Sequence, residues 1–365
     1  MPNNPTNNIN LFDTYTMLAL VEEIAPVPSF FKNRYFPTTE EDIFSTEKVL
    51  TEFKDGDYEM APMVSRRVGD IPVSRDGFAA AEIVPAYIGM SVPLTADDLN
   101  KRGFGEALFS NLSAAQRAAR LQLMDFNKLD ARITRREEWL AVQTMMNNSC
   151  TIQEYIDANS AGEEAILRYY EDPDEHKYVI GENWTAETSS AIIIGDIINM
   201  CDKLTQRGLP VTDLIVGSDV APIFRGNKDL RDLFNKQSGV ITGTINEVQY
   251  PGVVKMASGV NFGGYNLDIF CPNSVYKDAS GAMQRYYNPK SIMVTAEGAG
   301  SMKYAAVTQK EHGAAPEAWF TRTGKRIPKL ILNINDDYQA LRLTSRPLPV
   351  PKNKTPWISA ENVVK

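Results

Sequence analysis

Apolar residues recur at helical spacing over one long stretch of the chain, residues 106–149. The positions that follow one another at intervals of seven are Leu112, Ala119, Phe126, Ile133 and Leu140, with Ala115, Leu123 and Leu129 widening the stripe. The stretch contains no Gly or Pro and is rich in good helix formers. Polar residues at the interleaved positions make it a poor coiled-coil seam. The pattern therefore predicts a single helix, on the order of 50 Å long, with one face buried.

A second apolar period predicts a helix over residues 191–206, which Ser189 or Ser190 can cap. It leads into DLIVG, residues 213–217, which is typical of a buried strand, and then into two short helices around Gly226. Strand-like pieces prevail elsewhere, at residues 150–184, 240–269, 292–294, 303–307, 318–323, 330–334 and 340–344. Helices and mostly antiparallel strands are thus segregated, which indicates the α+β class.

Residues 50–94 alternate short apolar pieces with the turn-forming clusters DGD, RRVGD and SRDG. Pro62, Pro72 and Pro85 exclude a helix here. The pattern predicts an extended, two-stranded loop with its tip near residues 66–75. Because a hairpin of this length has little core of its own, we expect it to pack against something outside itself.

The N-terminal region has a different character. Residues 1–29 are Asn- and Pro-rich at first, which suits an arm that becomes ordered only against partners. The following segment, FFKNRYFPTTEEDIFSTEKV, is rich in aromatic and acidic side chains. We interpret it as the junction where the arm enters the body of the protein, anchored by Phe30, Phe31, Tyr35 and Phe36.

Composition and charge narrow the possible functions. The 365 residues, 43% of them hydrophobic, suffice for a sizeable core and for about two domains. The net charge of -8 argues against a protein whose main task is to grip nucleic acid, although one face could still line a space filled with DNA. Cys150, Cys201 and Cys271 form no CxxC pair, so we interpret them as reduced, half-buried thiols. Without a signal peptide or a bilayer-length apolar run, we expect a soluble intracellular product.

Residues with catalytic potential are few. His176 and His312 are the only histidines and lie in no triad spacing, so we expect both to be solvated loop residues. Ser274-Val-Tyr-Lys277 matches SxxK without its companion motifs. The sequence GAGSMK, residues 298–303, lacks the full phosphate-loop spacing, so a glycine-rich turn is expected there.

Charged runs are interpreted as solvated surface. Glu40–Asp42 and Asp336–Asp337 could hold a divalent cation in principle, but lone acidic runs usually face solvent. Arg135-Arg136 followed by Glu137-Glu138 is interpreted as a charged outer face of the long helix. The sequence therefore predicts no catalytic, cofactor-binding or metal-binding residue, and no enzyme.

Several motifs, taken in chain order, resemble a known protein family. They are Phe30-Phe31 with Tyr35-Phe36-Pro37, Ala61-Pro62-Met63-Val64-Ser65-Arg66, Gly77-Phe78 leading to Val84-Pro85-Ala86-Tyr87-Ile88, Leu94-Thr95 with Asp97-Asp98-Leu99, the helix 191–206, DLIVGSDVAPIF and the closing PLPVPKNKTPWISAE. Their order and spacing, over nearly the whole chain, resemble the lambda-type phage major capsid protein family, which has the Hong Kong 97 phage capsid fold.

The resemblance implies four parts. They are an N-terminal arm (1–45), an E-loop hairpin region (46–95), a peripheral domain with the long helix as its spine (96–190 and 302–345) and an axial domain (191–301 and 346–365). Arm and hairpin would each lie across neighbouring subunits. The suspected inter-subunit contacts are therefore Phe30, Phe31, Tyr35, Phe36, Arg66, Arg67 and Arg75.

The implied function is that of a major head protein of a tailed double-stranded DNA phage or prophage, which self-assembles into hexamers and pentamers of an icosahedral shell around the genome. Expected partners are copies of the chain itself, a separate scaffolding protein, a portal, a decoration protein as a further candidate, and packaged DNA held by non-specific contact. Arg132, Arg135 and Arg136 are basic side chains that could face phosphate. We expect no cofactor and no membrane partner, and a place in the virion after assembly in the host bacterial cytoplasm.

Two other functions stay open. An encapsulin-like nanocompartment shell would share the fold, although the arm and the Arg- and Gly-bearing hairpin match the phage family better. A small α/β enzyme using residues 189–236 as a nucleotide site would need a glycine-rich turn between strand and helix. The segment VGSDVAPIF offers one glycine and then a proline, which ranks this function last.

Overall fold

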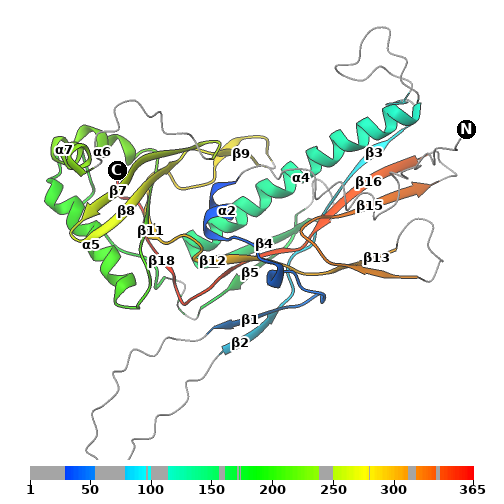
Figure 1. The fold of residues 1–365 in the computed structure, drawn as a ribbon, viewed down its shortest axis with the longest axis horizontal. Coiled ribbons are helices and arrows are strands. Elements are labelled where there is room, and N and C mark those ends of the chain that lie inside the picture. The colour runs from blue at the N-terminus through cyan, green and yellow to red at the C-terminus, as the bar shows by residue number, and fades with distance from the viewer. Residues whose placement is uncertain are drawn as a thin grey trace, which may run out of the picture.

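One long helix connects a sheet with its covering helices at one end of the molecule to an elongated part at the other (Figure 1). The computed structural model describes residues 29–53, 79–95, 98–99, 114–155, 161–170, 172, 174–237, 250–278, 280–310, 318–333 and 338–365. Helices and mostly antiparallel strands are segregated, as the α+β class requires.

The first end, which we call the sheet end, is built on five strands. In sheet order they are β18 (Trp357–Ala360), β11 (Ile292–Thr295), β6 (Asp213–Val216), β8 (Tyr265–Pro272) and β7 (Val253–Phe262). Only β6 and β8 pair in parallel; the other neighbours are antiparallel. The helices of this end are α5 (Ser190–Thr205), α6 (Ala221–Gly226) and α7 (Lys228–Gln237). These elements confirm the predicted helix, the buried strand and the two short helices around Gly226.

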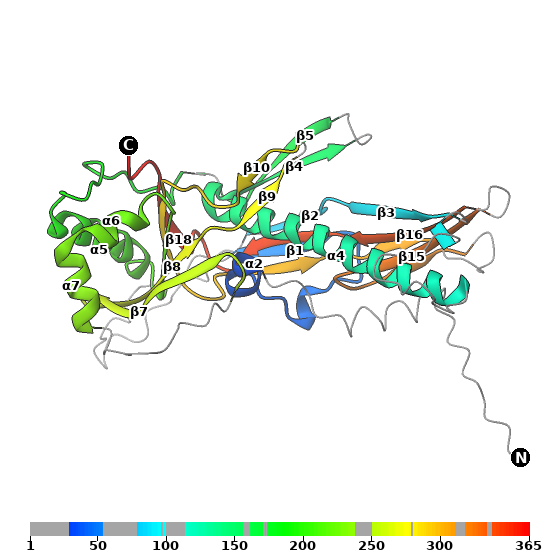
Figure 2. The same cartoon turned by 90° about the horizontal axis from the view of Figure 1, so that it is seen from above.

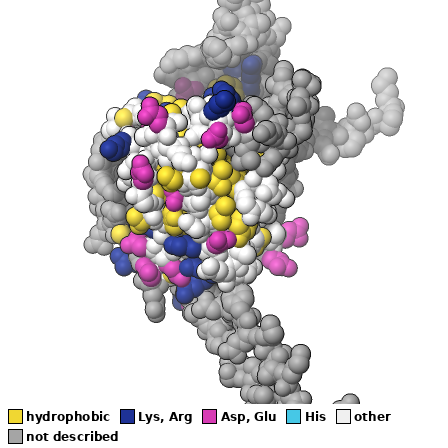
Figure 3. Space-filling view, turned by 90° about the vertical axis from the view of Figure 1, so that its left-hand side faces the viewer, with side chains coloured by type: hydrophobic (Ala, Val, Ile, Leu, Met, Phe, Trp, Pro, Cys, Tyr) yellow, Lys and Arg dark blue, Asp and Glu magenta, His cyan; other side chains and the backbone are white. Residues whose placement is uncertain are grey.

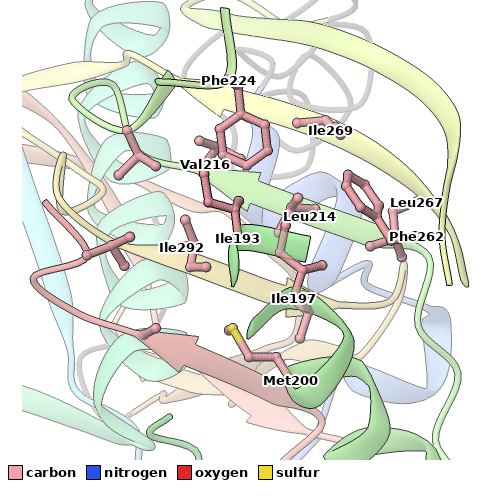
Figure 4. Close-up of a cluster of buried hydrophobic side chains, with 14 of the residues drawn as sticks. Ile193, Ile197, Met200, Leu214, Val216, Phe224, Phe262, Leu267, Ile269 and Ile292 are labelled. Atoms are coloured by element: carbon pink, nitrogen blue, oxygen red, sulfur yellow. The ribbon is translucent and has the colours of Figure 1, made fainter. Parts of the chain in front are cut away.

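Alternation along the strands divides the core of the sheet end into two clusters. On one face Leu214, Val216 and Ile292 pack against Ile193 and Ile197 of α5 (Figure 4). The intervening residues of β6 and β11 point to the other face. There they join Phe270 and Trp357 in a second cluster with α2 (Phe30–Tyr35) and the end of α4 (Ala114–Asn147). Because both faces are covered, every residue of β6 is buried, which explains the continuous apolar run that follows Asp213 in this strand.

The predicted long helix exists as α4, whose 34 residues make it about 51 Å long. Its apolar stripe packs on the sheet formed by β15 (Ile327–Asn333), β16 (Tyr338–Ser345) and β3 (Ile88–Leu94). Phe126, Leu129 and Ile133 are the buried residues of that stripe that contact this sheet, whereas Leu123 lies outside it and is 43% exposed. The helix ends at Asn147, and the next residue, Asn148, has a positive φ of 49°, the left-handed conformation common just after a helix.

Four antiparallel two-stranded ribbons lie at the periphery of the elongated part and of the sheet end. They are β1–β2 (Val49–Phe53, Ala79–Ile83), β4–β5 (Ser149–Tyr155, Ala161–Arg168), β9–β10 (Val275–Lys277, Met283–Arg285) and β13–β14 (Val307–Gln309, Phe320–Arg322). We call them the four ribbons. Figure 1 shows β1–β2 extending away from the body, and Figure 2 shows β4–β5 and β9–β10 projecting from one side.

The β1–β2 ribbon pairs Val49 with Ile83, as a two-stranded loop over this region predicts. The expected tip of that loop lies outside the described residues. A fifth two-stranded sheet, β12 (Gly300–Tyr304) with β17 (Pro347–Pro351), is buried inside the body. The Pro-rich closing segment thus supplies two strands, β17 and β18, that its composition does not reveal.

Candidate functional site

The aromatic segment of the junction forms the short helix α2, which closes the second face of the five-stranded sheet. Its rings meet mostly edge to face: the Phe30 centroid lies 5.1 Å from Phe31 and 5.4 Å from Tyr35. Phe30 also lies 5.1 Å from Phe270 of β8, and Phe36 lies near the indole ring of the last strand. Such aromatic pairs add to the stability that area burial alone provides.

This placement corrects the expectation that these rings contact neighbouring subunits. Phe30, Phe31, Tyr35 and Phe36 are only 0–2% exposed within the single chain. A side chain so fully buried in its own subunit has no surface left for a second copy. The four rings fix residues 30–36 to the body of their own subunit. The other suspected contacts, Arg66, Arg67 and Arg75, lie outside the described residues.

The first turn of α2 is capped by a side chain from α4. The Glu138 carboxylate accepts hydrogen bonds from Ser29 Oγ at 2.7 Å, from Phe31 N at 3.0 Å and from Lys32 N at 2.8 Å. A six-residue helix is not stable alone, and its first N–H groups need acceptors. Burial raises the pKa of Glu138, while these hydrogen bonds lower it in part. The spine helix therefore fixes the point at which the N-terminal segment joins the body.

A second carboxylate of α4, Glu137, lies at the centre of a buried charge cluster. Arg326 binds it through two nitrogens at 2.6 and 2.9 Å and binds Asp130 through Nε at 2.5 Å. Lys32 Nζ lies 2.5 Å from Glu137, and the Tyr304 hydroxyl donates to it at 3.0 Å. Burial alone would raise the pKa of Glu137, but the Arg326 and Lys32 charges outweigh it and lower that pKa to about 2.

The charge cluster corrects the interpretation of the Arg-Arg-Glu-Glu run as an outer face. Arg135 and Arg136 are exposed, whereas Glu137 and Glu138 are 0% and 5% exposed. The helical period predicts the burial of Glu137, because this residue follows the buried Ile133 by four positions and so lies on the same face of the helix. The partners of these carboxylates lie more than a hundred residues away in the chain, and no sequence pattern marks them.

A further buried ion pair ties α2 to the five-stranded sheet. Arg34 binds Asp213 through Nε at 2.5 Å and through Nη2 at 2.9 Å, and the Tyr35 hydroxyl donates to the same carboxylate at 2.9 Å. The hydrogen bond to Asp213 raises the pKa of Arg34. The guanidinium also lies 4.7 Å from the centroid of the Phe270 ring. This two-point geometry fixes orientation as well as distance.

The remaining residues with catalytic potential have structural positions. His176 is fully buried and its Nε2 donates to the Met146 carbonyl at 2.6 Å, so the expectation of a solvated loop histidine was wrong. His312 lies outside the described residues. All three cysteines are free and 0–4% exposed, more deeply buried than expected. Burial raises the pKa of the Cys150 and Cys201 thiols to about 12, which makes them poor nucleophiles.

The short motifs fall in strands and turns. Ser274 precedes strand β9 and its hydroxyl donates to the carbonyls of Pro251 and Gly252, whereas Lys277 is the last residue of that strand. The GAGSMK segment is a turn at Gly298, with φ of 68°, that enters β12. At Gly300 a Cβ atom would lie 2.4 Å from the Phe36 ring, so the glycine is needed for close packing. Asp42 closes a turn by binding the backbone N and Oγ1 of Thr39.

Within the residues that the structure describes, no three His, Cys, Asp or Glu side chains are arranged to hold a metal ion. The acidic run at Asp336–Asp337 lies outside them. None of the described helices is long and apolar enough to cross a membrane.

Comparison with known proteins identifies the family. The family model for phage major capsid protein E matches residues 13–362, nearly the full length of the chain. The chain belongs to the phage major capsid protein E family. The resemblance to phage major capsid proteins stated from the sequence motifs is thereby confirmed. No curated protein matches the sequence.

Solved phage capsid structures share the fold of this capsid protein. A protein assigned as the capsid protein of an E. coli CFT073 prophage aligns with a TM-score of 0.65 and 19% identity, over 96% of this chain and 98% of the other. The capsid of Ralstonia phage GP4 aligns with a TM-score of 0.51 and 11% identity, over 93% and 92%. The predicted α+β capsid fold is therefore confirmed. The protein is a structural subunit of the virion that assembles with its own copies into a shell.

Proposed function

We propose that this capsid protein forms the hexamers and pentamers of an icosahedral head that encloses packaged double-stranded DNA. The observation that supports this proposal is the exposure of large apolar side chains on all four ribbons. Leu50 on β1, Ile166 on β5, Met283 on β10 and Trp319 beside β14 are 44%, 55%, 64% and 63% exposed. A two-stranded ribbon is marginally stable by itself, so contacts with neighbouring subunits would complete each one.

We assign the four parts of the chain accordingly. The arm is residues 1–45 and the E-loop region is 46–95. The peripheral domain is 96–190 with 302–345, around α4, and the axial domain is 191–301 with 346–365. The pairing of β18 with β11 supports the return of the C-terminal segment to the axial domain.

The axial domain would gather around the axis of each capsomer. Figure 3 looks onto the sheet end and shows apolar side chains in the middle of this face, with charged side chains around them. Ile192 of α5 is one large apolar residue exposed at this end. An apolar centre with a polar rim is the usual anatomy of a subunit interface.

The proposed partners are further copies of the chain, a separate scaffolding protein, a portal, a decoration protein and the packaged DNA. Assembly would take place in the host bacterial cytoplasm, and the role is structural without catalysis. Many weak contacts acting together would supply the stability of the shell.

Expression of the chain with negative-stain imaging and size-exclusion chromatography tests this function. Megadalton shells, sheets or discrete capsomers are expected, and a stable monomer or dimer under all assembly conditions would contradict it. Nuclease treatment and protein analysis of purified particles then separate a head that holds nucleic acid from an encapsulin-like shell that holds an enzyme.

A further inference from the structure

The long helix α4 separates its charges by sign. It carries six basic and four acidic residues. Three of the four acids face inward, where Asp130, Glu137 and Glu138 are only 7%, 0% and 5% exposed. The exposed charged residues of α4 are all basic, namely Arg120, Lys128, Arg132, Arg135 and Arg136. We call these five the basic face of α4.

The buried charge cluster causes this separation. Arg326 and Lys32 neutralise Asp130 and Glu137 from the opposite side, and Glu138 accepts its hydrogen bonds from α2, so these carboxylates do not pair with the basic residues of their own helix. In the described part of the chain, no carboxylate lies within ion-pair distance of any residue of the basic face. The fourth acid, Asp125, is partly buried; burial raises its pKa, and the charge of Lys128 partly offsets this rise without an ion pair between the two. The basic face therefore keeps its positive charge within a protein whose net charge is -8.

The geometry of the basic face suits an extended polyanion. From Arg120 to Arg136 the helix rises about 24 Å, and the spacing of four residues between Lys128, Arg132 and Arg136 repeats the charge about every 6 Å. Four of the five residues are Arg, whose planar guanidinium is well matched to phosphate oxygens. Arg136 is also packed over the Trp139 ring, at 5.1 Å from its centroid, which restricts its position.

The same surface is poorly suited to a folded protein partner. Its exposed apolar residues, Leu123 and Met124, lie together at one end, and none lies among the exposed positions of 125–136. Interfaces between folded proteins need an apolar centre with charged residues largely excluded from it. Two copies of the basic face would repel one another, so it is not a contact between equivalent helices.

We propose that the basic face of α4 lines the interior of the shell and contacts backbone phosphates of the packaged DNA. The inference rests on the proposed function, since it requires a shell with DNA inside. It assigns this helix a second task besides packing, namely local neutralisation of phosphate charge by a subunit that is acidic as a whole.

The first test measures DNA binding by unassembled subunits. Fluorescence anisotropy with a short labelled duplex would compare the wild type with the triple variant Arg132→Gln, Arg135→Gln, Arg136→Gln over a range of NaCl concentrations. Loss of three phosphate contacts should reduce the salt slope, d log K/d log [NaCl], by about 3 and weaken binding at low salt at least tenfold.

A matched control removes the same charge elsewhere. Arg225→Gln, Lys228→Gln, Arg231→Gln changes three exposed basic residues of α6 and α7 and should leave the slope unchanged. Equal effects of the two triple variants, or wild-type subunits that bind no DNA at low salt, would overturn the inference. Competition with poly-glutamate of matched charge provides a further check. If poly-glutamate displaces the labelled duplex as effectively as unlabelled DNA does, the basic face prefers an acidic protein segment, and the inference is overturned.

The second test asks which way the helix faces in the shell. Because all three native cysteines are buried, an Arg132→Cys variant carries the one thiol open to a maleimide reagent. A polymer-linked maleimide too large to enter the shell should label unassembled subunits and leave assembled particles unlabelled. Equal labelling of both would place α4 on the outside and refute the inference. Absence of particles altogether would instead contradict the proposed function, while the binding test would still decide on the basic face.

Discussion

The five-stranded sheet and the four ribbons differ in how their apolar surface is covered. Each strand of the pair β6 and β11 is buried along its full length, between α5 on one face and α2 with α4 on the other. Each ribbon, by contrast, leaves a large apolar side chain in solvent. The central strands of the sheet end are covered within the subunit, whereas the ribbons leave large apolar side chains available for contact with another molecule.

This difference separates residues that hold the subunit together from residues available for assembly. The aromatic segment around α2 shows why the distinction matters, because its composition suggests an interface while its burial makes it core. Substitutions in the charge cluster and in the ribbons should therefore act on different quantities: the free energy of unfolding for the first and the yield of particles for the second.

The largest effect is expected at Arg326. The substitution Arg326→Ala removes the cation that Glu137 and Asp130 share, so Glu137 keeps Lys32 but the buried Asp130 loses its ion pair. Removing one member of a buried ion pair costs about 3–5 kcal/mol. Urea denaturation of the unassembled subunit measures the loss. Arg136→Ala on the exposed side of α4 serves as the control and should change the free energy of unfolding by less than about 0.5 kcal/mol; similar losses in both variants would contradict the central role of the cluster.

A smaller effect, which depends on pH, is expected at Glu137. Its folded-state pKa of about 2 lies below the ordinary 4.5, so its ionised form contributes stability that is fully present above pH 4.5. That contribution, about 3 kcal/mol at most, is lost as the pH falls from 4.5 towards 2. In Glu137→Gln the free energy of unfolding should fall less steeply over this range.

Glu138→Gln provides the comparison for this pH profile. Burial raises the pKa of Glu138, so its contribution has the opposite sign: it is present at low pH and lost as the pH rises through the folded-state pKa. In this variant the free energy of unfolding should fall at acid pH as steeply as it does in the wild type. If the free energy of unfolding fell less steeply at acid pH in Glu138→Gln and as steeply as in the wild type in Glu137→Gln, the roles assigned to the two carboxylates would be reversed.

The smallest effect on the subunit is expected in the ribbons. Trp319→Ser removes an indole that is 63% exposed and packs against Lys310. The free energy of unfolding should change by less than about 0.5 kcal/mol, because little buried surface is lost. Particle yield, measured by sedimentation, should fall. If the particle yield stayed normal in all three variants Trp319→Ser, Met283→Ser and Ile166→Ser, the ribbons would not carry the subunit contacts proposed for them.

Much of the fold is local in origin, which is why the sequence predicts it. The period of α4, the boundaries of α5 and the buried strand DLIVG each depend on residues within one segment. The strands β17 and β18 were missed because Pro-rich sequence argues against sheet; β17 nevertheless pairs along β12, inside the body.

The charge cluster and the role of the aromatic segment could not be predicted in the same way. Glu138 and the α2 backbone are joined over 106 and 107 positions of sequence, and the Arg326 contacts with Glu137 span 189. Composition marks Glu137 and Glu138 as surface residues, and only their helical phase argues otherwise. Burial of the four rings likewise depends on a sheet whose strands come from residues 213–360.

The distances in sequence that the charge cluster spans have a consequence for biosynthesis. Lys32 and Glu137 leave the ribosome long before Arg326, and β18 is made later still. Until then the carboxylates of α4 lack their main cation and the aromatic helix lacks one edge of the sheet that it covers. Such long-range closure slows folding. The nascent chain therefore completes its buried centre only after Arg326 and β18 have been made, long after α2 and α4.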